Sequence, residues 1–182
     1  DLSEEVKRVI EEVRKRIEEL VDEVRKSTEE VIKRVRRLVE EVERVVEDSR
    51  RKVDKLLKEG RITEEVVKRA EKILRDSKKH LEEVERKVRD DLRRSEEEIR
   101  RVLKEIEDRL RELKKKIDKL GGTEEVVRRL KEELEKALRD AERIVKELHE
   151  ENRKVLEDVK RMVDEDKKKN ERVVDEVRRD AK

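Results

Sequence analysis

The residues of this sequence that could carry out chemistry are few, and most of them gather around position 80. Asp76, Ser77 and His80 fall within the stretch "DSKKH", and the fold argued below brings His80 near Asp166. A hydroxyl, an imidazole and a carboxylate are the parts of a nucleophilic triad. However, the adjacent residues Asp76 and Ser77 point in different directions on a helix, and no Gly-rich turn offers an oxyanion hole. We therefore predict no catalytic residues and no enzyme activity.

The two histidines, His80 and His149, raise the separate question of a metal or a pH-sensitive site. A zinc site needs three or four convergent ligands, and two histidines at different heights of a helical fold do not supply them. We expect no metal and no cofactor. Instead, His80 and Asp166 are predicted to pair at the edge of the core, where a buried neutral imidazole would make acid destabilising. His149 lies one turn before Asn152 and could extend a polar contact there.

Six uncharged polar residues occupy positions where the apolar pattern requires a core residue. Counting away from the predicted loops places them in two layers, each with one residue per helix, although Ser49 lies about one turn from its layer. Buried polar groups are tolerated when donors and acceptors meet, and one amide with two hydroxyls can achieve this. We interpret the layers as structural, fixing register and pairing, rather than as a binding site, because small side chains leave no obvious cavity. The layers are Thr28, Ser95 and Asn152, and Ser49, Ser77 and Asn170.

Long helices must position these side chains, and the sequence marks their starts three times. "LSEEV", "ITEEVV" and "GTEEVV" place Ser3, Thr63 and Thr123 before two glutamates and a valine. A hydroxyl caps an unpaired N–H group, and carboxylates favour the positive end of the helix dipole. Gly60 and Gly121 supply the left-handed residue that closes a helix. The signals predict helices over about 3–59, 63–120 and 123–181, with short loops at about 60–62 and 121–122.

Apolar residues recur every three or four positions, and the leucines also follow a longer repeat. Leu2, Leu20 and Leu38 follow one another at intervals of eighteen positions, and similar series occur in the other two segments. Such an interval equals five helical turns, so the apolar stripe stays on one face of a straight helix, whereas heptads impose a supercoil. Short loops make neighbouring helices antiparallel. We predict an all-α fold, a long and near-untwisted antiparallel three-helix bundle that forms a single domain over 1–182.

Composition excludes several functional classes. The chain is 60% charged and has no aromatic residue, proline or cysteine, which is typical of coiled coils and long helices. Its 56 basic and 54 acidic residues are mixed along the chain, so no basic face is available for nucleic acid or an anionic membrane. The N-terminal stretch "DLSEEVKRVI" lacks the apolar centre of a signal peptide, and no run of 18 apolar residues occurs, so we expect neither secretion nor membrane spanning. We expect no nucleic-acid partner, no membrane association and no partner required for folding.

The repeated starts "SEEV" and "TEEVV", the minimal loops "GG" and "EGR", the surface of Glu, Lys and Arg and the polar layers resemble computationally designed three-helix bundles with buried hydrogen-bond networks. The resemblance covers the whole chain. It implies a stable monomeric scaffold without natural biochemical activity, cytoplasmic if expressed in a host. Spectrin-type repeats are similar in topology but use aromatic core residues, and exchangeable apolipoproteins interrupt their helices with proline.

The alternative function is a helical interaction or switch module in which helix 123–182 pairs with a partner helix or is displaced by one. This segment carries several small or polar core positions: Ala137, Ala141, Asn152, Asp166 and Asn170. It is therefore the element that we expect to be removable. Helix exchange between chains and homo-oligomerisation are the corresponding alternatives to a monomer.

Overall fold

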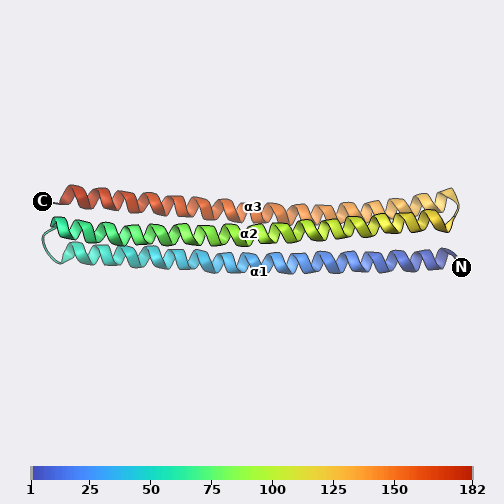
Figure 1. Cartoon of the computed structure of the whole chain (residues 1–182), viewed down its shortest axis with the longest axis horizontal. Helices are drawn as coiled ribbons and strands as arrows, with labels where there is room; N and C mark the ends of the chain where they lie inside the picture. The colour runs from blue at the N-terminus through green and yellow to red at the C-terminus, as the bar shows by residue number, and fades with distance from the viewer. Residues whose placement is uncertain (1, 182) are drawn as a thin grey trace. The chain divides into compact units, whose positions relative to one another are not determined.

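A computed structural model describes the backbone of residues 2–181 and the side chains of residues 4–119 and 121–181. It contains three helices: α1 Leu2–Lys58, α2 Glu64–Leu120 and α3 Glu124–Asp180 (Figure 1). These bounds agree with the predicted helices to within one residue. No strand occurs within residues 2–181. The prediction of an all-α three-helix bundle is therefore confirmed.

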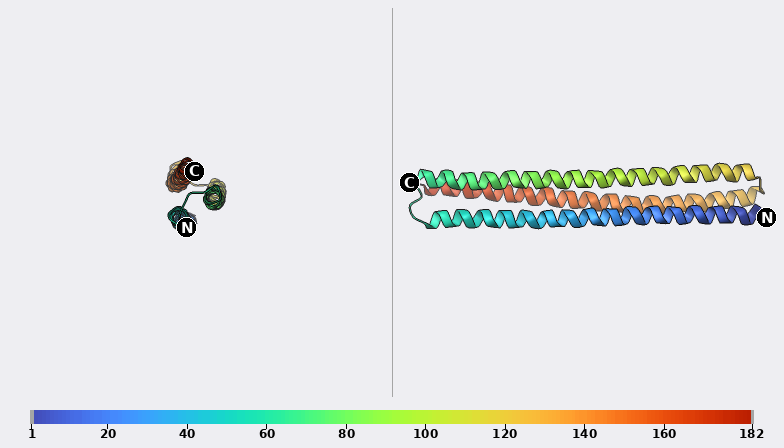
Figure 2. Two further views of the ribbon diagram at one scale, coloured as in Figure 1. Left: turned by 90° about the vertical axis from the view of Figure 1, so that its left-hand side faces the viewer. Right: turned by 60° about the horizontal axis from the view of Figure 1, so that its bottom comes forward.

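The helices pack within two compact units. The first unit comprises Asp1–Val31 and Arg93–Arg153, and the second comprises Ile32–Leu92 and Lys154–Lys182. Each unit contains one segment of every helix, and within each unit the α2 segment runs antiparallel to those of α1 and α3 (Figures 1 and 2). The single domain over 1–182 and the near-untwisted geometry stay predictions.

Two threonines cap helices as the sequence predicts. The Thr63 hydroxyl accepts a hydrogen bond from the Val66 N–H at 3.3 Å, and the Thr123 hydroxyl accepts one from the Val126 N–H at 3.4 Å. In both cases the donor is the third residue of the helix, which is the geometry expected of an N-cap. The glutamates that follow each threonine lie in the first turn of α2 and α3.

The remaining helix ends differ from one another. Gly121 has a φ of 58°, the left-handed value expected where a helix closes. Gly60 also has a positive φ, but at 153° it is far from that value, so the closure after α1 takes another form. α1 begins at Leu2, one residue before Ser3. The Ser3 side chain lies outside the described residues, so its capping role stays a prediction.

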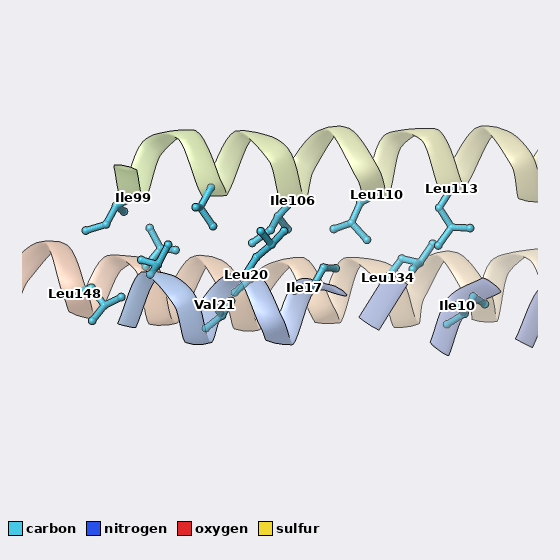
Figure 3. Packing of buried hydrophobic residues seen from close by; sticks show 14 of the residues in the cluster. Ile10, Ile17, Leu20, Val21, Ile99, Ile106, Leu110, Leu113, Leu134 and Leu148 are labelled. Carbon is cyan, nitrogen blue, oxygen red and sulfur yellow. The ribbon is translucent and has the colours of Figure 1, made fainter. Parts of the chain in front are cut away.

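In the first unit, a continuous apolar cluster joins all three helices. Ile99, Ile106, Leu110 and Leu113 project from α2 toward the side chains of α1 and α3 (Figure 3). Ile106 is fully buried, as expected for a position at the centre of the stripe. The other buried members on α1 and α3 are Val6, Ile10, Ile17, Leu20, Val21, Val24, Leu134, Ala141, Val145 and Leu148.

In the second unit, a smaller cluster packs near the loop between α1 and α2. Its buried members are Val53, Val67, Ala70, Leu74 and Val177. They come from all three helices, so the end of α1 and the start of α2 both pack against α3 through apolar contacts. Burial of such aliphatic side chains stabilises a fold by about 1.5–3 kcal/mol each.

The three helices contribute unequally to the buried apolar surface. Among the described residues, 12 buried apolar side chains lie on α1, 13 on α2 and 7 on α3. α3 instead presents many half-buried aliphatic side chains, such as Leu130, Leu138 and Leu156. It is therefore the helix held least by apolar burial.

Candidate functional site

The first polar layer lies inside the first unit. Thr28 and Asn152 are each 1% exposed and Ser95 is 3% exposed. Asn152 donates a hydrogen bond from Nδ2 to the Ser95 hydroxyl at 3.1 Å, which joins α3 to α2. Thr28 is buried on α1, and its hydroxyl does not donate to the Asn152 amide oxygen. The structure thus brings the α2 and α3 members of this layer into direct contact.

The second polar layer repeats this arrangement in the second unit. Asn170 donates from Nδ2 to the Ser77 hydroxyl at 3.4 Å. The third member, Ser49, turns back on its own helix and donates to the Val45 carbonyl at 2.8 Å. A serine in the middle of a helix readily makes this bond to the preceding turn. Because Ser49 also lies about one turn from its layer, its hydroxyl is satisfied locally and does not join the other two.

Each asparagine uses only half of its hydrogen-bonding groups. The Oδ1 atoms of Asn152 and Asn170 are buried and accept no hydrogen bond from any described residue. Leaving a buried acceptor unpaired costs about 1–3 kcal/mol. The predicted contact of one amide with two hydroxyls is therefore realised between α2 and α3 only, and both unpaired acceptors lie on α3.

His80 pairs with Glu41 rather than with Asp166. Its Nε2 lies 3.1 Å from Glu41 Oε1, which joins α2 to α1 in the second unit. The His80 side chain is 37% exposed, so it is not the buried neutral imidazole on which acid destabilisation would depend.

Asp166 lies at the edge of the core among charged neighbours. Partial burial raises the pKa of its carboxyl above the ordinary value, and repulsion from Glu165 and Glu43 adds to the rise. Lys169 and Arg50 act in the opposite direction and lower the pKa, but they do not cancel the effect of burial. Asp166 therefore favours its neutral form more than an exposed aspartate does.

His149 contacts Glu96 instead of extending the contact of Asn152. Its Nδ1 approaches Glu96 Oε2, which connects α3 to α2 beside the first polar layer. The His149 side chain is largely exposed, whereas that of Glu96 is mostly buried. A histidine–glutamate pair thus accompanies each polar layer, although the two pairs join different helices.

Ser27 makes a polar contact between helices that the sequence alone did not predict. Its hydroxyl donates to Glu98 Oε2 at 2.7 Å and joins α1 to α2 in the first unit. Ser27 precedes Thr28, so its side chain lies at the border of the apolar stripe. The sequence did offer a signal for this contact, because an uncharged serine is unusual in a chain whose surface is almost entirely charged.

The residues considered above as a catalytic triad do not come together in the structure. A hollow of about 220 Å³ between α1 and α2 is bordered by Asp76, Ser77 and His80, but not by Asp166. The Ser77 hydroxyl accepts from Asn170, and His80 faces Glu41. A nucleophile activated by a base requires the hydroxyl and the imidazole to be hydrogen-bonded, and the described side chains do not provide that bond.

A larger hollow of about 560 Å³ lies between α1 and α3 in the first unit. Ile17 and Val21 of α1 border it on one side, and Ala137 and Ala141 of α3 on the other. The two alanines are the physical cause, because their side chains do not fill the space that leucines would occupy. Charged side chains rim this hollow, among them Arg14, Arg25 and Lys136.

The described part of the chain contains no group of three or more His, Asp or Glu side chains that could hold a metal ion. No helix within residues 2–181 is apolar over a length that could cross a bilayer.

Among solved structures, the chain is similar to one titled "Computationally designed three helix bundle". The two are 19% identical, the match covers 99% of this chain and 82% of that chain, and the TM-score is 0.37. No family model and no curated protein matches the chain.

Proposed function

We propose that the chain is a designed, non-catalytic scaffold whose two buried polar layers specify how its helices pair. The observation that carries this proposal is that uncharged polar side chains of α2 and α3 are buried and hydrogen-bonded to one another. The chain has two asparagines, and both are buried and donate to a buried serine across the α2–α3 boundary. The interval of five helical turns that separates Asn152 from Asn170 also separates Ser77 from Ser95.

The apolar stripe alone discriminates poorly between alternative pairings. Because the leucines repeat every five turns, a helix from another chain displaced by one repeat would still bury its stripe. Such a displacement would match one layer but leave the other asparagine opposite a position such as Leu113, which lies one repeat beyond Ser95. A buried amide without any partner costs about 1–3 kcal/mol per group. The layers therefore favour one pairing over its neighbours.

The test is a variant in which every layer residue becomes apolar. Its mass is measured by light scattering on a size-exclusion column. Two differently tagged copies are also mixed, and native mass spectrometry detects any species that contains both tags. We expect the parent to elute at 22.1 kDa without mixed species, and the variant to form mixed dimers or larger species. The substitutions are Thr28→Val, Ser49→Ala, Ser77→Ala, Ser95→Ala, Asn152→Leu and Asn170→Leu.

A matched control keeps the polar pair but reverses it. Ser95→Asn combined with Asn152→Ser retains one amide and one hydroxyl at the same height, and we expect it to behave as the parent does. If the all-apolar variant also stays a single 22.1 kDa species that never mixes, the layers do not specify pairing and the proposal is wrong.

A second candidate function is an interaction or switch module in which α3 is the removable helix. It is favoured by the small share of buried apolar side chains on α3 and by the two unpaired amide oxygens that it carries. Expressing 1–120 and 123–182 separately and mixing them tests this function. One-to-one reconstitution supports the module, and failure to associate excludes it.

A further inference from the structure

In each unit, acidic side chains of α2 meet basic side chains of α3. The contacts occur in both units, so the feature is not local to one turn. Their nitrogen–oxygen distances fall between 2.7 and 3.4 Å where they are of ordinary length. The pairs are Asp118 with Lys131 and Glu96 with His149 in the first unit, and Glu82 with Lys167 and Glu71 with Arg178 in the second.

The basic side chains follow the same repeat as the asparagines. Lys131, His149 and Lys167 are separated by five helical turns each, and the last two stand one turn before Asn152 and Asn170. Side chains one turn apart are neighbours on one helix face. The α3 sequence therefore carries a repeated pair of groups, a basic side chain followed one turn later by a buried carboxamide.

The α2 surface carries the complementary pair. Ser95 is followed by Glu96, and the two bind Asn152 and His149 respectively. In the second unit, Ser77 binds Asn170 while Glu82 binds Lys167. A hydroxyl that binds the carboxamide of α3, together with a carboxylate that binds its His or Lys side chain, thus occurs on α2 in both units. The pair Lys114–Glu135, at 3.7 Å, has the reverse polarity and is an exception among these contacts.

The contact of α3 with α1 is looser in the first unit. The ion pair Arg14–Glu133 crosses from α1 to α3 at 3.9 Å, a longer distance than in the pairs between α2 and α3. The 560 Å³ hollow lies on this same side. The ion pair of Lys131 with Asp118 of α2, at 2.7 Å, is thus shorter than this contact with α1.

We infer that the α1–α2 surface recognises a free amphipathic helix of defined chemistry in place of α3: a helix with a five-turn repeat, buried asparagines, and basic side chains one turn before them on the α2 side. The inference rests on the second candidate function and adds the chemistry of the partner. The four α2 carboxylates named above bind the basic side chains of such a helix, and Ser77 and Ser95 accept from its carboxamides.

The experiment uses the full chain with a protease site inserted between Gly121 and Gly122, so that α3 can be cut free without removing it. The cut protein is mixed with a fluorescent helix of the α3 sequence, and its incorporation is followed by native mass spectrometry and fluorescence anisotropy. The matched control is the same helix with Lys131→Glu, His149→Glu, Lys167→Glu and Arg178→Glu. Circular dichroism checks that both free helices have equal helicity.

We expect the parent helix to be incorporated at least about tenfold more than the charge-reversed one, since its contacts with the carboxylates of α2 are replaced by like-charge contacts. Added salt should reduce this difference. Reversing Asp118, Glu96, Glu82 and Glu71 to lysine in the cut chain should restore incorporation of the reversed helix, which shows that the reversed helix remains able to bind.

Equal incorporation of both helices, or failure of the compensating reversal, overturns the inference while leaving α3 a removable helix. If the cut chain falls into two separate pieces, or takes up neither helix, the second candidate function fails and the inference fails with it. The two failures are therefore distinguishable by whether any helix is taken up.

Discussion

Replacement of Asn152 by leucine is the most informative single substitution in the core. Asn152 is almost fully buried and donates to Ser95, but its Oδ1 accepts no hydrogen bond from the described residues. Asn152→Leu removes this unpaired acceptor, whose burial costs about 1–3 kcal/mol, and loses one hydrogen bond, which contributes about 0.5–1.5 kcal/mol. The apolar side chain adds burial, which imperfect fit partly offsets, so we expect a net stabilisation of about 1–2 kcal/mol.

Guanidinium unfolding followed by circular dichroism measures this change. The midpoint should rise while the slope stays that of the parent, because the folded and unfolded surfaces are nearly the same. Ser95→Ala is the matched control: it leaves the Asn152 amide without its acceptor as well, so we expect a loss of about 1–3 kcal/mol. The two substitutions together should be close to Asn152→Leu alone.

Destabilisation of the protein by Asn152→Leu would refute this reasoning. That result would mean that the amide oxygen has a partner, such as a buried water, and that the layer is fully satisfied. The same reasoning predicts at least as large a stabilisation for Asn170→Leu, because its hydrogen bond to Ser77 is longer at 3.4 Å.

Three further predictions concern other parts of the fold. Because the pKa of Asp166 is raised, its contribution to stability is fully present below the unfolded value and is lost as the pH rises through the folded one. Asp166→Asn should therefore gain stability relative to the parent at pH 7, by less than about 1 kcal/mol, and this gain should vanish near pH 3 in unfolding titrations. Thr63→Ala and Thr123→Ala each remove an N-cap and should cost about 1 kcal/mol in denaturant unfolding, whereas no change would show that these caps are dispensable. Ile106→Ala, at a fully buried site, should cost about 2–5 kcal/mol by the same assay, and a loss below about 1 kcal/mol would contradict the core described here.

The helices and the buried positions could be predicted because their signals are local and repeated. Thr63 and Thr123 mark helix starts by side-chain chemistry that acts within one turn. The apolar repeat then decides which face of each helix is buried, and it placed Thr28 and Asn152 among the buried residues.

The hydrogen-bond partners could not be predicted with the same success. His80 was expected to meet Asp166, but with 54 acidic residues in the chain several carboxylates can reach a given imidazole, and Glu41 is the one that does. The Ser49 hydroxyl donates to the Val45 carbonyl of its own helix, and this local hydrogen bond competes with any contact across the core. Burial follows from periodicity, whereas pairing depends on side-chain conformations that periodicity does not encode.

The side-chain amide signals of the two asparagines provide the most direct test of the polar layers. The sequence contains no glutamine, so a ¹⁵N–¹H spectrum has only the NH₂ groups of Asn152 and Asn170 as carboxamide signals. We predict that both pairs are protected from hydrogen exchange, that Ser95→Ala shifts only the Asn152 pair, and that Ser77→Ala shifts only the Asn170 pair. Rapid exchange at the shifts of an unfolded peptide, or no response to either serine substitution, would contradict the account of two buried layers that join α2 to α3.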